Sequence, residues 1–194
     1  MKTINETVTN QIDINKSIFI TKIYKVSSLD DIKEKLTEIK DEYKDATHYT
    51  YAYIVDDLRK SSDDGEPGGT AGVPIMNVLL KNELNYILCI VVRYFGGIKL
   101  GAGGLVRAYT KAVVEALKNE ILIELTEGYK IKIKTAYENQ KNLDFLLRNF
   151  NVNKTYGNEI EYIVEIPKEN LYLLEERSIE FSILQSKYIK KNKA

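Results

Sequence analysis

The sequence predicts an α+β protein with two domains, residues 1–127 and 128–194. Stretches that alternate apolar and polar residues, as strands do, are mixed with stretches whose apolar residues recur every three or four positions, as in helices. From residue 128 the order of these stretches is β-α-β-β-α-β, that of a ferredoxin-like unit. The charge balance also changes there: residues 128–194 carry 12 Lys and Arg against 9 Asp and Glu, whereas residues 1–127 carry 16 against 19.

The first part of the chain predicts two strands separated by a helix. Residues 18–26 alternate as a strand. Apolar residues at Ile32, Leu36, Ile39 and Tyr43 then have helical spacing, and Ser28 precedes them as a weak N-cap signal. Residues 49–55 alternate again, which predicts a second strand with three tyrosines and a valine on one face.

Two glycine-rich stretches follow. Residues 56–72 contain four glycines, one proline and almost nothing apolar, so we predict a loop throughout. The second stretch is residues 95–104. Between them we predict a helix over residues 73–84 and a strand over residues 86–92, whose continuous apolar character is typical of a strand covered on both faces.

The remaining elements complete both domains. A helix over residues 104–118 is predicted from its apolar face, and residues 120–125 are predicted as the last strand of the first domain. In the second domain we predict strands at 129–135, 152–156, 160–166 and 183–189, with helices around 143–150 and 168–177.

Composition excludes several protein classes. The 194 residues carry equal numbers of basic and acidic side chains, so net charge alone indicates neither a nucleic acid nor a membrane as partner. A single cysteine, Cys89, excludes a disulfide framework, and its apolar neighbours predict a buried, inert thiol. The polar N-terminus has no signal-peptide core, and the longest apolar run is too short for a membrane span. We therefore expect a cytoplasmic protein without a membrane partner.

The second glycine-rich stretch is the strongest functional signal. It joins a strand to a helix, where free backbone N–H groups attract anions, and no acidic residue occurs from Leu88 to Val114. Neither a P-loop nor a dinucleotide-binding motif is present, and close packing of the helix on the strand is an equally good explanation of the glycines. The residues predicted to bind phosphate or nucleic acid are Arg93, Tyr94, Gly96, Gly97, Lys99, Gly101, Gly103, Arg107 and Lys111.

The first glycine-rich stretch carries the acidic residues Asp63, Asp64 and Glu66. We expect them to line one cleft with Arg93 or Lys99, because functional loops converge. Their oxygens offer an alternative metal site, although ordinary turn chemistry is favoured over it. The only histidine, His48, is either a hydrogen-bonded structural residue, which is favoured, or part of the site. We expect no cofactor.

Three segments resemble the signatures of a known family. SDDGEPGGTAGVPI (Ser62–Ile75), VVRYFGGIKLGAGGLVRAY (Val91–Tyr109) and the weaker ATHYTYAY (Ala46–Tyr53) closely resemble those of the IMPACT/YigZ family. The resemblance implies a first domain like domain 2 of ribosomal protein S5, and a ferredoxin-like second domain like those of elongation factor G. It also implies a link to translation, because eukaryotic relatives compete for the activator of a stress kinase that acts on an initiation factor.

The residues and the resemblance together predict a translation-associated regulatory protein that contacts RNA or the ribosome through its glycine-rich basic loop and helix. Two alternatives stay open. One is a metal-assisted hydrolase or phosphotransferase of small molecules, and the other is a pure protein-interaction module with a partner in translation or stress control. The sequence offers no nucleophile beside a base, which favours a binding protein over an enzyme.

Overall fold

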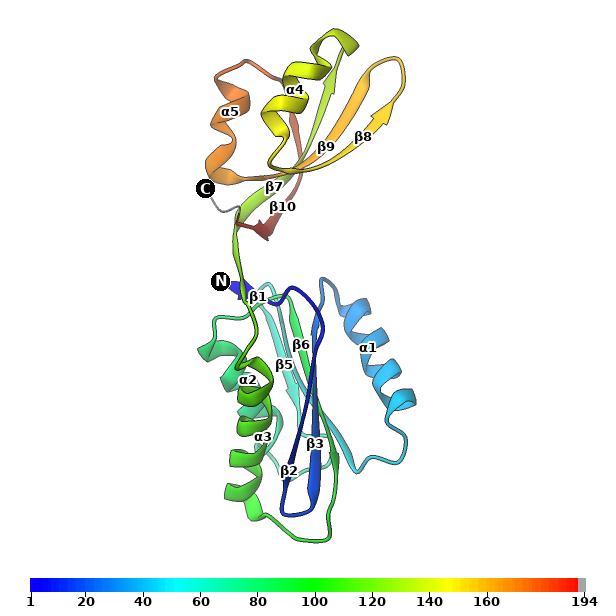
Figure 1. The fold of residues 1–194 in the computed structure, drawn as a ribbon, viewed down its shortest axis with the longest axis vertical. Coiled ribbons are helices and arrows are strands. Elements are labelled where there is room, and N and C mark those ends of the chain that lie inside the picture. Colours follow the sequence, from blue (N-terminus) through cyan, green and yellow to red (C-terminus); the bar gives the residue numbers. More distant parts are fainter. Residues whose placement is uncertain (192–194) are drawn as a thin grey trace. The chain divides into compact units, whose positions relative to one another are not determined.

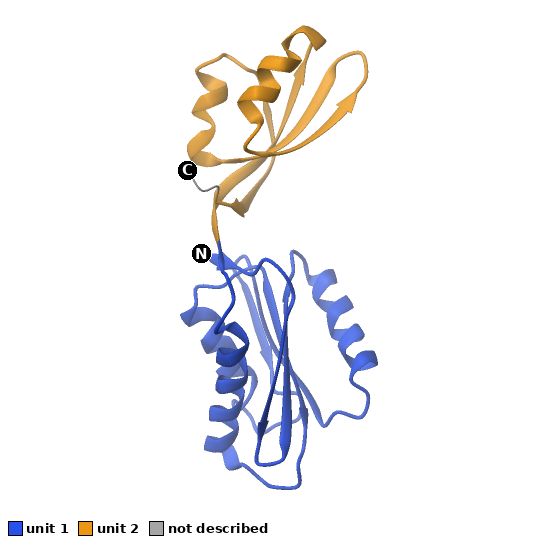
Figure 2. Ribbon diagram, viewed as in Figure 1, with its two compact units in different colours: residues 1–123 blue, residues 124–194 orange. Residues whose placement is uncertain are grey.

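The computed structural model describes residues 1–191 and divides into two compact units, residues 1–123 and 124–194 (Figure 2). The division falls just ahead of the boundary predicted between residues 127 and 128. No helix among residues 1–191 is long and apolar enough to cross a membrane. The two units are both mixtures of helices and strands, and each has its own sheet and core.

The first unit contains one antiparallel sheet between two layers of helix (Figure 1). Its elements are β1 (Lys2–Thr3), β2 (Val8–Ile14), β3 (Ser17–Lys25), α1 (Leu29–Glu42), β4 (His48–Val55), β5 (Leu58–Ser62), α2 (Gly72–Lys81), β6 (Ile87–Tyr94) and α3 (Gly101–Leu117). The strand order is β2-β3-β6-β4-β5. Helix α1 lies on one face of the sheet, whereas α2 and α3 lie together on the other (Figure 1).

The central strand β6 contributes to an apolar core on each face of the sheet. Cys89 and Val91 belong to the core under α2 and α3, and Leu88 and Ile90 to the core under α1. All four side chains are fully buried. Successive side chains of a strand point to opposite faces, so a continuous apolar run is needed to fill both cores. This confirms the prediction of a strand covered on both sides.

Helix α1 starts at the predicted serine. The side chain of Ser28 accepts a hydrogen bond from the backbone N–H of Asp31 at 3.1 Å. The Asp31 carboxylate in turn accepts from the backbone N–H of Ser27 at 2.7 Å. This reciprocal arrangement satisfies N–H groups at the helix start, as a capping box does, with Asp in the place usually taken by Glu.

Two edge strands were not predicted from the sequence. Residues 58–62 form β5, so the prediction of a loop across all of residues 56–72 is wrong there. At the other edge, β2 is formed by residues that carried no predicted element. Both strands have a largely polar sequence, because an edge strand can expose much of its surface. The turn into β5 is tight, and Asp56 in it has a φ of 57°.

The second unit is a four-stranded antiparallel arrangement with short helices. Its elements are β7 (Ile123–Thr135), the 3₁₀ helix η1 (Tyr137–Asn139), α4 (Gln140–Leu147), β8 (Asn151–Tyr156), β9 (Ile160–Pro167), the 3₁₀ helix η2 (Lys168–Asn170), α5 (Tyr172–Glu175) and β10 (Ser182–Lys190). β9 lies between β7 and β8, and β10 pairs with β7. The order of elements is β-α-β-β-α-β; the S5-like and ferredoxin-like assignments stay predictions.

A single long strand, β7, replaces the two strands predicted on either side of Gly128. The glycine does not end the strand, because its missing side chain makes room for another strand. A Cβ at this position would lie 2.5 Å from Ile189 Cδ1 and 2.7 Å from the Ile166 carbonyl oxygen. Gly128 therefore allows neighbouring strands to approach β7 closely. The sequence alone does not distinguish such a glycine from one in a turn.

Candidate functional site

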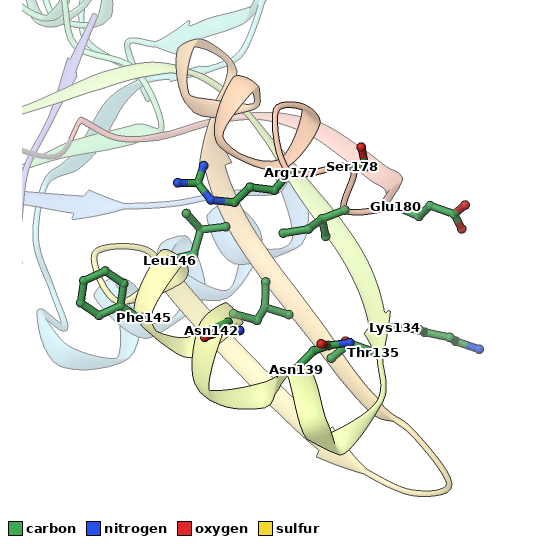
Figure 3. Close-up of a pocket in the computed structure, with 11 residues that line it drawn as sticks. Lys134, Thr135, Asn139, Asn142, Phe145, Leu146, Arg177, Ser178 and Glu180 are labelled. Atoms are coloured by element: carbon green, nitrogen blue, oxygen red, sulfur yellow. The ribbon is translucent and has the colours of Figure 1, made fainter.

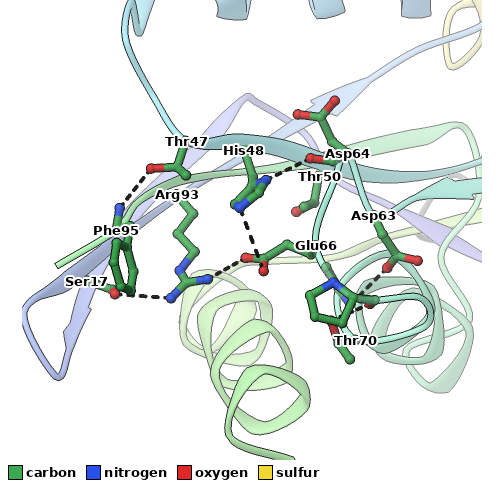
Figure 4. Close-up of polar contacts among 12 residues, drawn as sticks. Ser17, Thr47, His48, Thr50, Asp63, Asp64, Glu66, Thr70, Arg93 and Phe95 are labelled. Atoms are coloured by element: carbon green, nitrogen blue, oxygen red, sulfur yellow. Dashed lines mark hydrogen bonds and ion pairs between the residues drawn. The ribbon is translucent and has the colours of Figure 1, made fainter. Parts of the chain in front are cut away.

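A buried ion pair joins the two glycine-rich segments of the first unit (Figure 4). Arg93 on β6 donates from Nη1 to Glu66 Oε1 at 2.6 Å, and the Tyr109 hydroxyl on α3 donates to the same oxygen at 2.7 Å. The Glu66 and Arg93 side chains are 3% and 5% exposed. Burial, and then the bond to Glu66, raise the pKa of Tyr109 well above its usual value, so this hydroxyl stays protonated and donates.

Arg93 is therefore held inside the protein and does not present its charge to a ligand. Its Nη2 donates to Ser17 Oγ at 3.3 Å, and its guanidinium lies within cation–π distance of the Phe19 and Phe95 rings. Its Nε has no hydrogen-bond partner among the described residues. The prediction that Arg93 neutralises phosphate is corrected on this geometry: a buried guanidinium paired with a carboxylate is electrostatically satisfied within the fold.

His48 bridges β4 and the acidic loop. Its Nδ1 lies 2.8 Å from the backbone carbonyl oxygen of Asp64. Because a carbonyl only accepts hydrogen bonds, Nδ1 carries a hydrogen, and in the neutral ring Nε2 carries the lone pair. Nε2 lies 3.8 Å from Glu66 Oε2, too far for a direct hydrogen bond. His48 is thus hydrogen-bonded to the acidic loop through Asp64, and its structural role stays a prediction.

The three acidic side chains of the loop do not converge. Asp63 accepts hydrogen bonds from the backbone N–H groups of Gly69, Ala71 and Gly72. Burial opposes ionisation of Asp63, but these three bonds outweigh it and lower the pKa of the carboxyl. Asp64 Oδ2 accepts from the backbone N–H of Tyr49 at 2.6 Å.

With Glu66 paired to Arg93, each of these carboxylates has its own protein partner. Among residues 1–191 there is no group of three His, Cys, Asp or Glu side chains arranged to hold a metal ion. The alternative metal site is corrected accordingly. Of the cleft predicted between the two loops, the structure retains only the contact of Glu66 with Arg93, and that contact is buried.

The first residues of the second glycine-rich loop are fixed by hydrogen bonds and packing, whereas the next ones have free backbone N–H groups. The N–H of Phe95 donates to Thr47 Oγ1 at 3.0 Å and that of Gly96 donates to Ser17 Oγ at 3.2 Å. A Cβ on Gly96 would lie 2.0 Å from the carbonyl carbon and oxygen of Lys16, so this glycine is required for packing. By contrast, among the described residues the N–H groups of residues 97–99 have no hydrogen-bond partner.

Helix α3 begins at Gly101, earlier than the predicted residue 104. Gly101 and Gly103 therefore belong to its first turn, where the N–H groups have no partner within the helix. No side chain caps this end, and Gly101 has a φ of 69°, a conformation that glycine adopts without strain. The open N–H groups of the loop thus continue into the start of the helix.

Basic side chains occur in this loop and along the exposed side of the helix that follows it. Lys99, Arg107 and Lys111 are exposed, and none of them forms a salt bridge within the described part of the chain. Sequence reasoning missed Lys16, which also lacks a salt bridge and whose backbone packs against Gly96. Only the pairing of β3 with β6 brings it there. We call Lys16, Lys99, Arg107 and Lys111 the basic surface.

The neighbouring aromatic residues Tyr94 and Phe95 lie in different surroundings at the start of the loop. Tyr94 packs against the core under α1, and its hydroxyl donates to the Lys44 carbonyl oxygen at 3.2 Å. Tyr94 therefore does not belong to the basic surface. Phe95 is 45% exposed, and Ile98 in the loop and Val106 on α3 are also exposed.

Cys89 is fully buried in β6, and burial raises the pKa of its thiol far above the usual range. A nucleophilic role would need the thiolate, which this apolar environment disfavours. Glu66, Arg93 and Tyr109 from two of the segments singled out in the sequence thus form a buried polar cluster with Ser17 of β3. Ser17 also accepts from the backbone N–H of Gly96, where the exposed basic loop begins.

Comparison with known proteins gives consistent results. Residues 15–117 match the family model of the Impact N-terminal domain. The chain is 46% identical over 125 residues to IMPACT family member YvyE of Bacillus subtilis, covering 63% of this chain and 58% of that protein. It is 35% identical over 140 residues to IMPACT family member YigZ of Escherichia coli, covering 70% of this chain and 69% of that protein. The match thus spans less than two thirds of YvyE.

A solved structure resembles the whole chain. It is described as the crystal structure of a hypothetical protein, is 29% identical, covers 94% of this chain and 95% of its own, and superposes with a TM-score of 0.65. The likeness to this solved structure thus extends over both units of the chain.

Proposed function

The chain belongs to the IMPACT family, and from that premise we propose that it is a translation-associated regulatory binding protein that contacts RNA or the ribosome through its basic surface. The link to translation comes from the family resemblance. The contact with RNA is supported by one observation, the coincidence of unpaired cations with unpaired backbone N–H groups around residues 97–103. Both kinds of group bind phosphate oxygens, and neither is engaged elsewhere in the described protein.

The proposal favours binding over catalysis. The carboxylates that an enzyme would use as bases or metal ligands are each held by internal hydrogen bonds. The single histidine donates to a backbone carbonyl, and the single thiol is buried. A metal-assisted hydrolase or phosphotransferase therefore finds no support in the arrangement of these groups.

A protein-interaction module is the second candidate. Phe95, Ile98 and Val106 expose apolar surface beside the cations, and such side chains are typical of protein interfaces. A partner captured on immobilised protein after nuclease treatment, and retained at high salt, would favour this function. Release by nuclease would favour RNA.

The decisive measurement is the salt dependence of RNA binding. Wild-type protein should bind a single-stranded RNA with an affinity that falls steeply with salt, because each neutralised phosphate contributes about −0.7 to the log–log slope. Lys99→Ala with Arg107→Ala should flatten the slope by about 1.4 if both side chains contact phosphate. An unchanged slope in the folded double variant would contradict the proposal.

A matched control comes from the opposite face of the sheet. Lys33→Ala with Lys35→Ala on α1 removes the same number of positive charges, but these lysines are paired with Asp30 and Glu38. This control should leave the affinity and the slope nearly unchanged. An equal effect of both double variants would mean that only the net charge of the protein matters.

A further inference from the structure

Phe95 is an exposed aromatic ring with a rigid support. Its backbone N–H is bonded to Thr47 Oγ1, and its ring centroid lies 5.6 Å from the Arg93 guanidinium carbon (Figure 4). Arg93 cannot move away readily, because it is held by Glu66 and Ser17. It also lies 5.3 Å from the ring centroid of the buried Phe19. The exposed ring therefore rests on a buried cation that is held through both of its Nη atoms.

This support reduces the cost of using the ring for binding. A flexible exposed side chain loses rotamer freedom when a ligand orders it, whereas a ring already packed against a fixed neighbour loses less. The unusual feature is that 45% of Phe95 is still exposed although its backbone and one neighbour are fixed. Packing within the unit thus accounts for the position of the ring and leaves its exposed surface unused.

The surroundings of Phe95 indicate the chemistry of its ligand. The backbone N–H groups of residues 97–99 are open, Lys99 is exposed and unpaired, and Lys16 lies in the hairpin turn that packs on Gly96. A ligand that matches them has a flat π-surface joined to negative charge. Accessible bases linked by phosphates have both properties.

We propose that the basic surface binds single-stranded RNA, with one base stacked on Phe95. This inference rests on the proposed function and makes it more specific. In duplex RNA the bases are stacked on one another and only the backbone and groove edges are accessible, so Phe95 has no free base to contact. Lys16, Lys99 and the open N–H groups would hold the flanking phosphates and bring a base to the ring.

The chain offers an unusually clean reporter for this contact, because it contains no tryptophan. Phe95→Trp places a single indole at the proposed stacking position. A uridine oligomer of about 12 nucleotides, comparable to known single-strand site sizes, should quench its fluorescence on binding. Inorganic polyphosphate, which carries the charge without bases, should bind without comparable quenching.

Phe145→Trp is the matched control. Phe145 on α4 is also exposed, at 67%, and also lies beside an arginine, with Arg148 4.2 Å from its ring centroid. It lies in the second unit and outside the basic surface. Addition of the same oligomer should leave the fluorescence of this variant unchanged.

The affinity test uses Phe95→Leu, which keeps an apolar side chain and removes the aromatic ring. Single-strand affinity should fall about tenfold, within the range measured for one base stacked on an aromatic side chain, whereas duplex affinity should not change. Phe95→Tyr should retain wild-type single-strand affinity. Circular dichroism of each variant verifies that the protein is folded.

The outcomes separate this inference from the proposed function. If wild type binds the oligomer with the expected salt dependence but Phe95→Leu binds equally well and Phe95→Trp is not quenched, stacking is overturned and phosphate binding stands. If wild type binds no RNA, the proposed function fails and this inference fails with it. Binding of an acidic peptide in preference to RNA would overturn stacking in favour of a protein partner.

A cleft in the second unit does not carry a proposal of its own. A cleft of about 720 Å³ in the second unit lies between α4 and the segment that follows α5, with Asn139, Asn142 and Arg177 among its lining residues (Figure 3). Its polar groups are mixed in charge, and nothing in the structure indicates what occupies it.

Discussion

Glu66 and Arg93 are 27 residues apart in the sequence and form a buried ion pair, with 2.6 Å between Oε1 and Nη1. The pair connects the two glycine-rich segments of the chain. Glu66 belongs to the first, and Arg93 reaches Ser17, which accepts from Arg93 and from the backbone N–H of Gly96 in the second. The acidic loop therefore contributes to the position of the basic loop through Arg93 and Ser17.

Glu66→Gln should destabilise the protein by about 3–5 kcal/mol, because it leaves the buried Arg93 charge without a counterion. Urea denaturation followed by circular dichroism measures this loss. Glu38→Gln is the control, since Glu38 forms an exposed pair with Lys35, and it should cost less than about 1 kcal/mol. A loss below about 1 kcal/mol for Glu66→Gln would contradict a central role of the buried pair.

Tyr109→Phe should cost about 1.5–3 kcal/mol, the range for a hydrogen bond to a charged partner. The variant removes only the hydroxyl that donates to Glu66 at 2.7 Å. Tyr94→Phe removes a hydroxyl with a longer, more exposed bond to a backbone carbonyl, and should have a smaller effect in the same denaturation experiment. Equal effects of the two variants would argue against a special contribution from the buried bond.

Gly96→Ala should cost about 1–3 kcal/mol or more, because the new methyl group meets the rigid backbone of Lys16. Thermal denaturation compares it with Gly68→Ala, where a Cβ has nothing within 4 Å. The Gly68 variant should lie within about 0.5 kcal/mol of wild type. If the Gly96 variant is equally stable, the β2–β3 turn does not pack against the loop as described.

Asp31 should make stability depend on acid pH. The backbone N–H of Ser27, and then the hydroxyls of Ser27 and Ser28, lower the pKa of Asp31 from 3.8 to about 2. Because the folded-state pKa is lower than the unfolded one, the stabilisation is complete above about pH 4 and is lost as pH falls through about 2. Asp31→Asn should therefore be less stable than wild type at neutral pH.

The stability difference between these two proteins should narrow between about pH 4 and pH 2. Urea denaturation across that interval measures it. A difference that does not change with pH would mean that hydrogen bonding by the carboxylate is not what stabilises the start of α1.

The regular elements with local periodicity were predictable from sequence. Alternation over residues 49–55 placed Tyr53 and Ala52 on opposite faces, and the structure assigns them to different cores. The strands with polar sequence were not predictable, because β5 depends on pairing with β4 for its hydrogen bonds and not on an apolar face. The continuity of β7 through Gly128 was not predictable for a similar reason, since the residues that need its missing side chain, Ile166 and Ile189, lie far along the chain.

For the candidate site, the order of residues was enough to identify the segments involved, the absence of acidic residues from 88 to 114 and the glycine-rich loop that leads into a helix. Which of those residues are exposed to a ligand depends on the three-dimensional packing. Arg93 is buried against Glu66, and Tyr94 packs on the core under α1 and not on the basic surface. Lys16 lies beside Gly96. The physical reason is that composition and periodicity are local, whereas burial and pairing depend on strand register, which joins residues such as Ile18 and Tyr94 across the sheet.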